Sequence, residues 1–445
     1  MKSRQNNENG QAIVLIALAF IVMVGFAALA IDGGMFYSDR RHAQNAADAG
    51  ALAGAGDAAL ILENAHLFNQ NFECNLSVVT NAMAVAESTA LDWMSYNGYA
   101  DPGTDEPAEA VCTSITTNDD GSPLFFPKKY IELTTDIITD TQTALIHVVY
   151  DGPAQNRVKA TTKIEPPIPY AYGQAVVGLN PETDCNNASV AGVKFGGTGD
   201  ARITGGGVWS EGCLTGNGSC IVEVIDPDTT DDKYVGIGYH GGSFGSCPTM
   251  TPAPVPSNES LPKESYYVPA PSCRDELGNV KTGAVEMDDI QLSGNQVVNL
   301  NDLGVDLICL TSTGNAIKMT GGELIGDEGI TIYLENSGDI EISGGIANLM
   351  APGAYEDPGL AGVLFYVDDT DESVIDITGN VTSTYMGMIY APKADIKITG
   401  TGDIGPTLNT QIIGWNVTLL GTANVTINFN NTWNSIKPST LNLEK

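Results

Sequence analysis

The side chains in this sequence that are best suited to covalent chemistry are those of its eight cysteines, which all lie after residue 73. No Cys-x-x-Cys motif is present and the four His residues, at 42, 66, 147 and 240, are scattered, so disulfides are favoured over a zinc site. Disulfides are typical of an exported protein. The placement of the cysteines around a helix, a turn and a Pro-rich segment predicts three pairs and leaves two residues over: Cys74–Cys112, Cys213–Cys220 and Cys247–Cys273, with Cys185 and Cys309 remaining.

Clustered carboxylates are the second group that could do chemistry. Three runs stand out, Asp288-Asp289, Asp327-Glu328 and residues 368–372. The third is a candidate calcium loop, because Ca²⁺ prefers carboxylate oxygens. Its candidate ligands are Asp368, Asp369, Asp371 and Glu372. Solvated loops are the simpler interpretation, since a chain with 54 acidic residues contains such runs by chance. We therefore predict no catalytic residue, no metal other than calcium and no cofactor.

The overall charge excludes one class of partner. The formal net charge is −34, with 54 acidic residues against 20 basic ones. A protein that binds nucleic acid needs a basic face for the phosphates, so we expect no nucleic-acid partner. Neither a P-loop nor a Gly-x-Gly-x-x-Gly motif after a strand is present, and nothing predicts a bound nucleotide.

The element that must position everything else is a long N-terminal helix. Residues 12–31 are uncharged and mainly apolar. At 1.5 Å per residue they span about 30 Å, the hydrocarbon thickness of a bilayer. Residues 1–31 therefore read as a cytoplasmic leader and a membrane anchor. A cleaved signal peptide is the alternative, because Lys2 and Arg4 form a basic start and Ala28-Leu29-Ala30 resembles a cleavage site.

The helical pattern continues beyond the anchor as an Ala-rich segment. Small residues recur there at helical spacing and form a stripe that lets another backbone approach closely. The stripe comprises Ala43, Ala46, Ala47, Gly50, Ala53 and Gly54. It predicts a packing partner, either elsewhere in the chain or, for a filament subunit, in a second copy.

This N-terminal region resembles a known family. Residues 9–12, the apolar run, Ala30-Ile31-Asp32-Gly33-Gly34 and the run Gln44-Asn45-Ala46-Ala47-Asp48-Ala49 are similar to the TadE/TadG-like family of the tight-adherence (Flp-type) pilus machinery. The resemblance covers about the first 55 residues. It implies a membrane anchor, an exported remainder and pilus proteins as partners. Leu15 stands where type IV-like prepilins carry Glu, so the resemblance favours an assembly or surface role over a processed pilin subunit.

Residues 32–165 are predicted to form a small α+β, pilin-like stalk domain. Apolar spacing predicts a second helix over 78–96, and residues 101–127 read as a loop. Three strand-like runs follow, at 130–135, 143–150 and 158–164. Glu165-Pro166-Pro167-Ile168-Pro169 is a stiff linker that ends this domain.

Residues 166–445 carry a repeat in which an apolar alternation runs into Ser/Thr-Gly. From Gly294 the repeat glycines are 27, 23, 35, 21 and 21 residues apart, close to one coil of a solenoid. We therefore predict a mainly β chain that ends in a right-handed parallel β-helix, stapled by cysteines and carrying a Pro-rich insertion near 248–271. A β-sandwich is the alternative. The inward ladder of the β-helix would be Leu292, Met319, Ile342, Ile377, Ile398 and Leu419.

Together these features predict a single-pass membrane protein whose C-terminal region is exported to the cell surface or periplasm. The expected function is structural, in a pilus or cell-surface assembly, with self-assembly as one form of it. The alternative is an adhesin that binds glycans or surfaces. A polysaccharide-processing β-helix enzyme ranks third, because no catalytic motif is present.

The ladder generates a test. Replacing Ile377 by Asp should bury an unpaired carboxylate and lower the free energy of unfolding by several kcal/mol. The adjacent Asp376 should point outward by strand alternation, so Asp376→Asn should change that free energy by no more than about 0.5 kcal/mol. Chemical denaturation of both variants checks this, and equal tolerance at the two positions would show that the ladder is misplaced.

Overall fold

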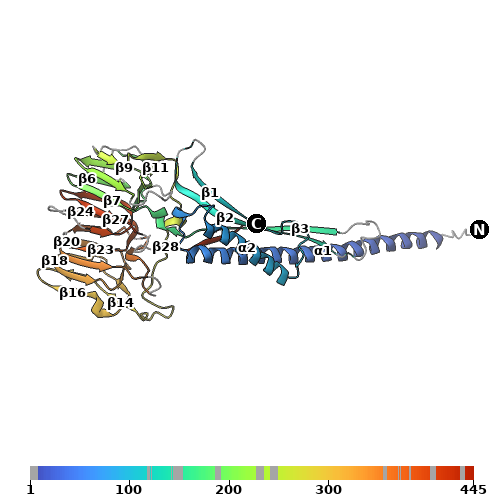
Figure 1. The fold of residues 1–445 in the computed structure, drawn as a ribbon. Coiled ribbons are helices and arrows are strands. Elements are labelled where there is room, and N and C mark those ends of the chain that lie inside the picture. The colour runs from blue at the N-terminus through green and yellow to red at the C-terminus, as the bar shows by residue number, and fades with distance from the viewer. Residues whose placement is uncertain are drawn as a thin grey trace, which may run out of the picture.

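The protein is a long helix that carries a stack of β-strands at its far end (Figure 1). The computed structural model describes residues 9–117, 121, 123–141, 143, 154–185, 192–226, 235–240, 249–353, 358–368, 370, 372–379, 382–400, 407–430 and 436–444. We call the part built on the helix the stalk and the stack of strands the head.

Two helices form one layer of the stalk. Helix α1 (Asn9–Asn64) has 56 residues, and no proline occurs before residue 102 to interrupt it. The helix ends at a left-handed residue, His66, where Leu67 N donates to Leu62 O and His66 N to Glu63 O. The chain then passes through the short helix η1 (Asn69–Asn71) into α2 (Ser77–Tyr96). This second helix buries the apolar face expected from its spacing, namely Val79, Ala82, Ala86, Ala90 and Met94.

An antiparallel sheet in the order β1-β2-β3-β29 forms the other layer. Its strands are β1 (Ala108–Thr117), β2 (Pro123–Thr141), β3 (Ala154–Glu165) and β29 (Thr440–Glu444). The predicted loop over 101–127 is wrong, since β1 and the start of β2 lie within it. Of the strand predicted over 143–150, only Thr143 is described, and it lies outside any strand. Residues 440–444, assigned from the sequence to the repeat domain, instead pair with β3 of the stalk.

In the head, 23 strands are joined in one sheet, and every pairing given for them is parallel. The register divides the strands into three ladders, in which each strand has its partners one step above and below. The pairings that define the first ladder run β14-β17-β19-β21-β24-β26-β5-β8-β11-β13. This arrangement is consistent with a β-helix.

The strands of the head have the following bounds. Those from residues 176 to 257 are β5 (Val176–Gly178), β6 (Val193–Gly197), β7 (Asp200–Thr204), β8 (Val208–Ser210), β9 (Leu214–Gly218), β10 (Ile221–Ile225), β11 (Ile237–His240), β12 (Thr249–Thr251) and β13 (Val255–Ser257). Those from 284 to 350 are β14 (Ala284–Met287), β15 (Ile290–Leu292), β16 (Val297–Asn299), β17 (Leu307–Leu310), β18 (Asn315–Gly326), β19 (Thr331–Leu334) and β20 (Asp339–Met350). Those from 363 to 428 are β21 (Val363–Val367), β22 (Val374–Gly379), β23 (Thr384–Met386), β24 (Met388–Gly400), β25 (Thr407–Asn409), β26 (Ile412–Gly421) and β27 (Val425–Asn428).

Short elements complete the description. Beside the stalk lie β4 (Ile168–Pro169), which pairs with β28 (Ile436–Lys437), and the turn η3 (Tyr170–Gly173). Helix α3 (Lys263–Tyr266) and the turn η4 (Leu300–Leu303) belong to connections in the head. The Pro-rich segment 248–271 was expected to be an irregular insertion, but it contains β12, β13 and α3.

The predicted inward ladder is confirmed by the register. Its members are consecutive partners on parallel strands, from Leu292↔Met319 to Ile398↔Leu419, and the row continues onto Phe195 of β6. All six side chains are at most 3% exposed and belong to the main apolar core of the head. The alternation of apolar and polar residues that gives strands one buried face therefore also sets the register.

The chain enters this stack in its middle. It starts at β5, proceeds to one end at β13, and then passes along the outside of the first ladder to begin again at β14. We call the connecting segment, residues 258–283, the strap. From β14 the strands return step by step until β26 and β27 pair with β5, β6 and β7. We call this meeting of early and late strands the seam.

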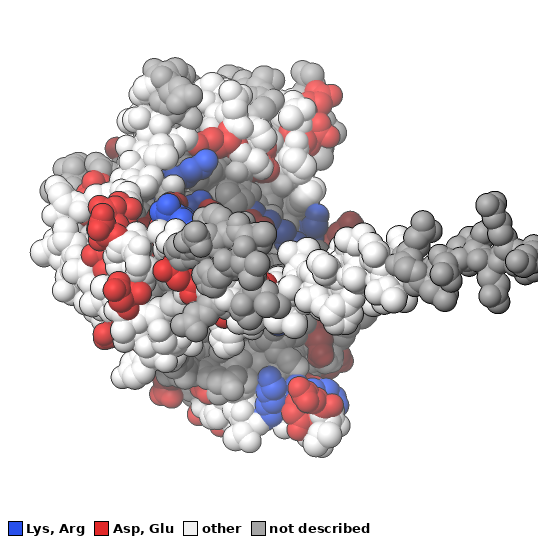
Figure 2. All heavy atoms as spheres, turned by 90° about the vertical axis from the view of Figure 1, so that its right-hand side faces the viewer, with Lys and Arg blue, Asp and Glu red and all other residues white. Residues whose placement is uncertain are grey.

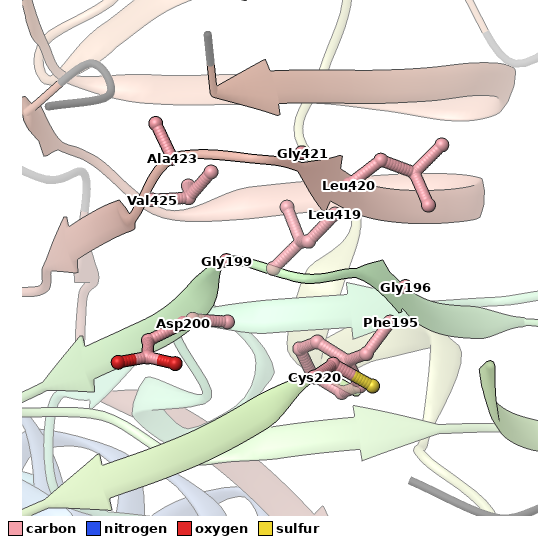
Figure 3. A pocket seen from close by; sticks show the side chains of 11 residues that line it. Phe195, Gly196, Gly199, Asp200, Cys220, Leu419, Leu420, Gly421, Ala423 and Val425 are labelled. Carbon is pink, nitrogen blue, oxygen red and sulfur yellow. The ribbon is translucent and has the colours of Figure 1, made fainter. Parts of the chain in front are cut away.

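Figure 3 shows a small hollow at the seam, lined from one side by Phe195, Gly199 and Asp200 and from the other by Leu419, Gly421 and Ala423. The two sides approach closely here. The backbone nitrogens of Thr198 and Gly199 both donate to Gly421 O at 3.0 Å. A Cβ on Gly199 would lie 2.2 Å from Ala423 O. A side chain at this position is therefore incompatible with the seam as it is packed.

The close approach predicts the effect of a methyl group. Gly199→Ala should push the two sides of the seam apart and lower the free energy of unfolding by about 1–3 kcal/mol. Gly314→Ala is the matched control, because the first atom met by a Cβ on this exposed Gly314 is the Ser312 hydroxyl oxygen at 4.0 Å. Denaturant titration measures both, and equal effects would contradict the seam packing.

Candidate functional site

The first half of α1 is exposed apolar surface. Side chains from residue 13 to residue 31 lie outside both cores of the stalk; Ile13 is 69% exposed and Leu29 is 66% exposed. Within the described residues this is the one helix that is long and apolar enough to cross a membrane. An uncovered run of this length is unfavourable in water, since each large apolar side chain gains about 1.5–3 kcal/mol on leaving it.

The second half of α1 is packed, and the packing uses the predicted small-residue stripe. Ala43, Ala46 and Ala47 are fully buried, Gly50 and Gly54 are buried, and Ala53 is half-buried. A Cβ on Gly54 would lie 2.3 Å from Ala86 O of α2 and 2.8 Å from Leu133 Cδ2 of β2. The stripe thus brings α1 against α2 and the sheet of its own chain. The predicted packing partner therefore lies in the same chain, and because these side chains are covered, the stripe offers no open surface for the polymerisation that a filament subunit would need.

Polar groups fix the sheet against the helices. Thr135 Oγ1 donates to Ala47 O of α1 at 3.0 Å, and Asn156 Nδ2 donates to Phe36 O at 3.3 Å. Lys129 is buried, and its ammonium donates to Glu73 Oε1 at 3.3 Å. The first two contacts tie the strands to α1 at residues 47 and 36, and the third ties β2 to the segment between η1 and α2.

One acidic side chain organises the open face of the sheet. Asp136 is buried between Arg157, which donates to both of its oxygens, and Lys159, whose Nζ lies 3.3 Å from Asp136 Oδ2. The hydrogen bond from Arg157 lowers the pKa of Asp136 below its ordinary value; burial acts in the opposite direction and Lys159 adds to the lowering. The two basic side chains are themselves more than half exposed.

The cysteines form disulfides, and the structure corrects the predicted pairs. Cys74–Cys112 is confirmed and ties α2 to β1. Cys213 pairs with Cys185 and not with Cys220, and Cys273 pairs with Cys309 and not with Cys247. Cys220 is also disulfide-bonded, while Cys247 lies outside the described residues. The pairs within the head cross between segments, so spacing in the sequence does not reveal them.

The predicted carboxylate runs do not come together. In the part of the chain that the structure describes, no group of three His, Cys, Asp or Glu side chains could hold a metal ion. Asp368 Oδ1 accepts hydrogen bonds from Thr370, Asp327 accepts one from Asn301, and Asp288 and Asp289 are exposed. Glu372 is exposed, and Asp369 and Asp371 lie outside the described residues. Calcium binding stays a prediction.

A second apolar core joins strap, stalk and head, and the sequence analysis missed it. A row of register partners on the successive strands from β17 to β8 contributes to it, namely Cys309, Tyr333, Tyr366, Tyr390, Ile413, Val177 and Trp209. The strap covers this row, with Tyr366 Oη donating to Val268 O and Val268 N donating to Tyr390 Oη. From the stalk, Phe125 and Phe126 pack on Trp209 at ring distances of 5.1 and 4.7 Å.

Glu211 adds hydrogen bonds to this contact between strap and head. Its carboxylate accepts from Trp209 Nε1 at 2.9 Å and from Leu261 N at 3.0 Å, and it contacts Ser260 and His240. The one sequence signal for the contact between stalk and head was the adjacent aromatic pair Phe125-Phe126, which lies in a segment predicted to be a loop. A loop that exposed both rings would be unfavourable, so the pair calls for a partner surface.

The packing stripe generates a test with a control on the same helix. Gly54→Ala should lower the free energy of unfolding by about 1–3 kcal/mol, because the new methyl group meets a backbone carbonyl. Gly56→Ala should leave it unchanged or raise it by up to about 1 kcal/mol, since its Cβ would meet nothing within 4 Å and Ala is the better helix former. Thermal and chemical unfolding of both variants decides it.

Comparison with known proteins agrees with the geometry of α1. A family model described as putative Flp pilus-assembly TadE/G-like matches residues 10–57. No curated protein and no solved structure matches the chain. The matched residues begin just before the exposed apolar run of α1 and end just past the packing stripe, three residues after Gly54. The N-terminal region of this chain, from the apolar run through the packing stripe, thus matches the TadE/G-like family of Flp pilus assembly.

Proposed function

We propose that this chain is a membrane-anchored structural protein of a pilus or cell-surface assembly. The observation that carries the proposal is the division of α1 into an exposed apolar half and a packed half within one uninterrupted helix. If residues 13–31 lie in the bilayer, residues 32–64 raise the head by about 50 Å from the membrane surface. The chain then acts as a rigid spacer with its head outside the cytoplasm, in the compartment where its disulfides form.

We further infer that the three parallel ladders form a right-handed β-helix. Parallel registers, a stacked apolar interior and short connections support this, and parallel connections within one sheet are right-handed in nearly all proteins. Because the strap and the stalk cover the first ladder, the other two ladders would present the outward surface of the head.

An adhesin is the second candidate. The outer side of the second ladder carries a regular row of charged side chains, in which Lys318 pairs with Glu341 at 2.7 Å and Lys397 with Asp376 at 2.6 Å. Such a row, left open to solvent, could bind a polar polymer such as a glycan. We propose a structural role and not an enzymatic one; it is supported by the use of Glu341 and Asp376 in ion pairs and of Asp368 in a turn.

Membrane extraction tests the anchor. Replacing Ile21 and Val22 by Arg puts two charges at the centre of the apolar run, each costing about 2.5–3.5 kcal/mol on insertion. The unmodified chain should stay in the membrane after alkaline extraction, and the double variant should be released. Leu60→Arg is the matched control, because Leu60 is 56% exposed on the packed half of the same helix, and it should stay in the membrane.

Two outcomes contradict the proposal. One is a mature protein that begins near Ile31 and is found in the membrane-free fraction, which would show a cleaved signal peptide. The other is equal retention of the double variant and the unmodified chain, which would show that something other than the apolar run holds the protein.

A further inference from the structure

Helix α1 is covered on only one side where it leaves the apolar run. On the covered side Asp32 is 5% exposed, and Asn156 Nδ2 of β3 donates to Phe36 O at 3.3 Å. On the other side, a Cβ built on Gly33 or Gly34 would meet no atom within 4 Å. Figure 1 shows β3 running beside α1 toward its N-terminal end. The base of the stalk thus leaves one side of α1 open directly after residue 31.

The two adjacent glycines on this open side need an explanation. Glycine weakens a helix interior relative to alanine. Gly50 and Gly54 are required by the packing of α1, because a Cβ on them would lie 3.0 Å from Ala90 O and 2.3 Å from Ala86 O. No contact of this kind requires glycine at positions 33 and 34. Their missing side chains leave a notch, at which a group from outside the chain can come close to the backbone.

A tyrosine and two arginines lie on the same face of the helix as the notch. Counted from Gly33, the five positions are i, i+1, i+4, i+7 and i+8, which share one face. Tyr37 is 69% exposed, and both arginines are exposed. The Cα–Cβ bonds of a helix tilt toward its N-terminus, so the arginine side chains extend back over the notch. We call this face the base site; it comprises Gly33, Gly34, Tyr37, Arg40 and Arg41.

The two arginines keep their positive charge without a partner from the described part of the chain. Neither Arg40 nor Arg41 has an ion pair there. Their neighbour Asp39 acts elsewhere. Burial raises the pKa of Tyr99, and the negative charge of Asp39 raises it further, which places Asp39 on the side of α1 that faces the segment after α2.

Two other carboxylates near the base of the stalk are also directed elsewhere. Asp48 Oδ1 accepts a hydrogen bond from Gln44 Nε2 at 2.7 Å and lies about 10 Å farther along α1 than the arginine pair. Asp140 is the register partner of Gln155 on the outer face of the sheet, which is turned away from α1. The base site therefore carries an excess of positive charge.

The base site lies at the height of lipid headgroups. If residues 13–31 lie in the bilayer, Tyr37 and Arg40 stand about 9 and 14 Å beyond its hydrocarbon edge, measured at the backbone. The headgroup layer is about 5–8 Å thick, so arginine side chains that point back along the helix reach its phosphates. Tyrosine is enriched at this interface.

Two electrostatic arguments bear on the arginine pair. Lys and Arg close to a membrane span are usually cytoplasmic, so two of them within ten residues of the span on the exported side call for a local role. Figure 2 shows acidic side chains over the side of the head that faces the stalk. Salt limits the interaction of exposed charges to about 8–10 Å, so these carboxylates do not offset the arginines at the base.

We propose that the base site binds the phosphate of an anionic glycerophospholipid in the leaflet on the exported side. The guanidinium groups of Arg40 and Arg41 donate to the phosphate oxygens, and the notch at Gly33 and Gly34 admits the headgroup beside the helix. A headgroup held on the open side, opposite the sheet, fixes the tilt of the stalk on the membrane. The inference rests on the proposed function, because it requires residues 13–31 to lie in the bilayer.

Photocrosslinking from the full chain in vesicles tests the proposal. The vesicles contain phosphatidylcholine with a minor share of phosphatidylglycerol, and the exposed Ser38 is replaced by p-benzoylphenylalanine. Lipid adducts identified by mass spectrometry should be enriched in phosphatidylglycerol over the vesicle composition. Arg40→Gln combined with Arg41→Gln should lower that enrichment about fivefold or more. Gly33→Leu combined with Gly34→Leu fills the notch and should lower it although both arginines remain.

Matched controls separate the base site from general charge. Lys128→Gln combined with Lys393→Gln removes the same charge from two exposed positions outside the base and should leave the enrichment unchanged. The photoreactive residue in place of Tyr96, which is 86% exposed on α2, should give no lipid adduct. Equal effects of the arginine and lysine variants would show a bulk charge effect and overturn the proposal.

Alkaline extraction of the same samples distinguishes the two levels of inference. A chain released from the vesicles contradicts the proposed function itself. A chain that stays in the membrane contradicts the base site alone if position 38 gives no lipid adduct or gives adducts in the proportions of the vesicle. Enrichment that persists in the arginine variant or in the leucine variant overturns the site as well.

Discussion

The structure depends on the seam, where the first strands of the head in the sequence pair with the last ones. Val176 of β5 pairs with Ile412 of β26, and Ala201 of β7 pairs with Val425 of β27. In an ordinary solenoid each repeat contacts only its neighbours in sequence. Here the two sections, 176–257 and 284–428, are joined by contacts that form only after a very long loop has closed, which costs chain entropy and slows folding.

The strap reduces the entropy cost of closing this loop, because a disulfide and several hydrogen bonds hold it against the head. The Cys273–Cys309 disulfide joins it to β17, hydrogen bonds to Val268 join it to β21 and β24, and the Glu211 carboxylate joins it to β8. The same covered row receives Phe125 and Phe126 from the stalk. One line of outward residues therefore holds together the two sections of the head and also the head and the stalk.

The sequence predicts the features that follow from a local repeat of apolar or small residues. It does not predict contacts between segments that are far apart in the chain. The ladder from Leu292 to Leu419 follows from alternation, and the exposed apolar run and the packing stripe of α1 follow from run length and spacing. Strand β1 was missed because its surroundings are rich in Pro, Gly and Asp, and its partner β2 supplies the order. The pair Cys185–Cys213 was missed because it joins the β5–β6 connection to the β8–β9 connection, which only the pairing of β5 with β8 and of β6 with β9 brings together. The pair Cys273–Cys309 was missed because it depends on the strap lying against β17. Nothing in the local composition near residue 176 reveals that the chain enters the stack in its middle.

The return of the chain to the stalk through β29 has a mechanical consequence. A pull on the head, away from the N-terminal end of α1, divides between the backbone at residues 165–169 and the pairing of β29 with β3. The force runs along these strands while their hydrogen bonds lie across them, so the bonds are loaded together in shear and do not open one after another. The terminal strand thus acts as a second tether, and the joint between head and stalk resists both extension and rotation.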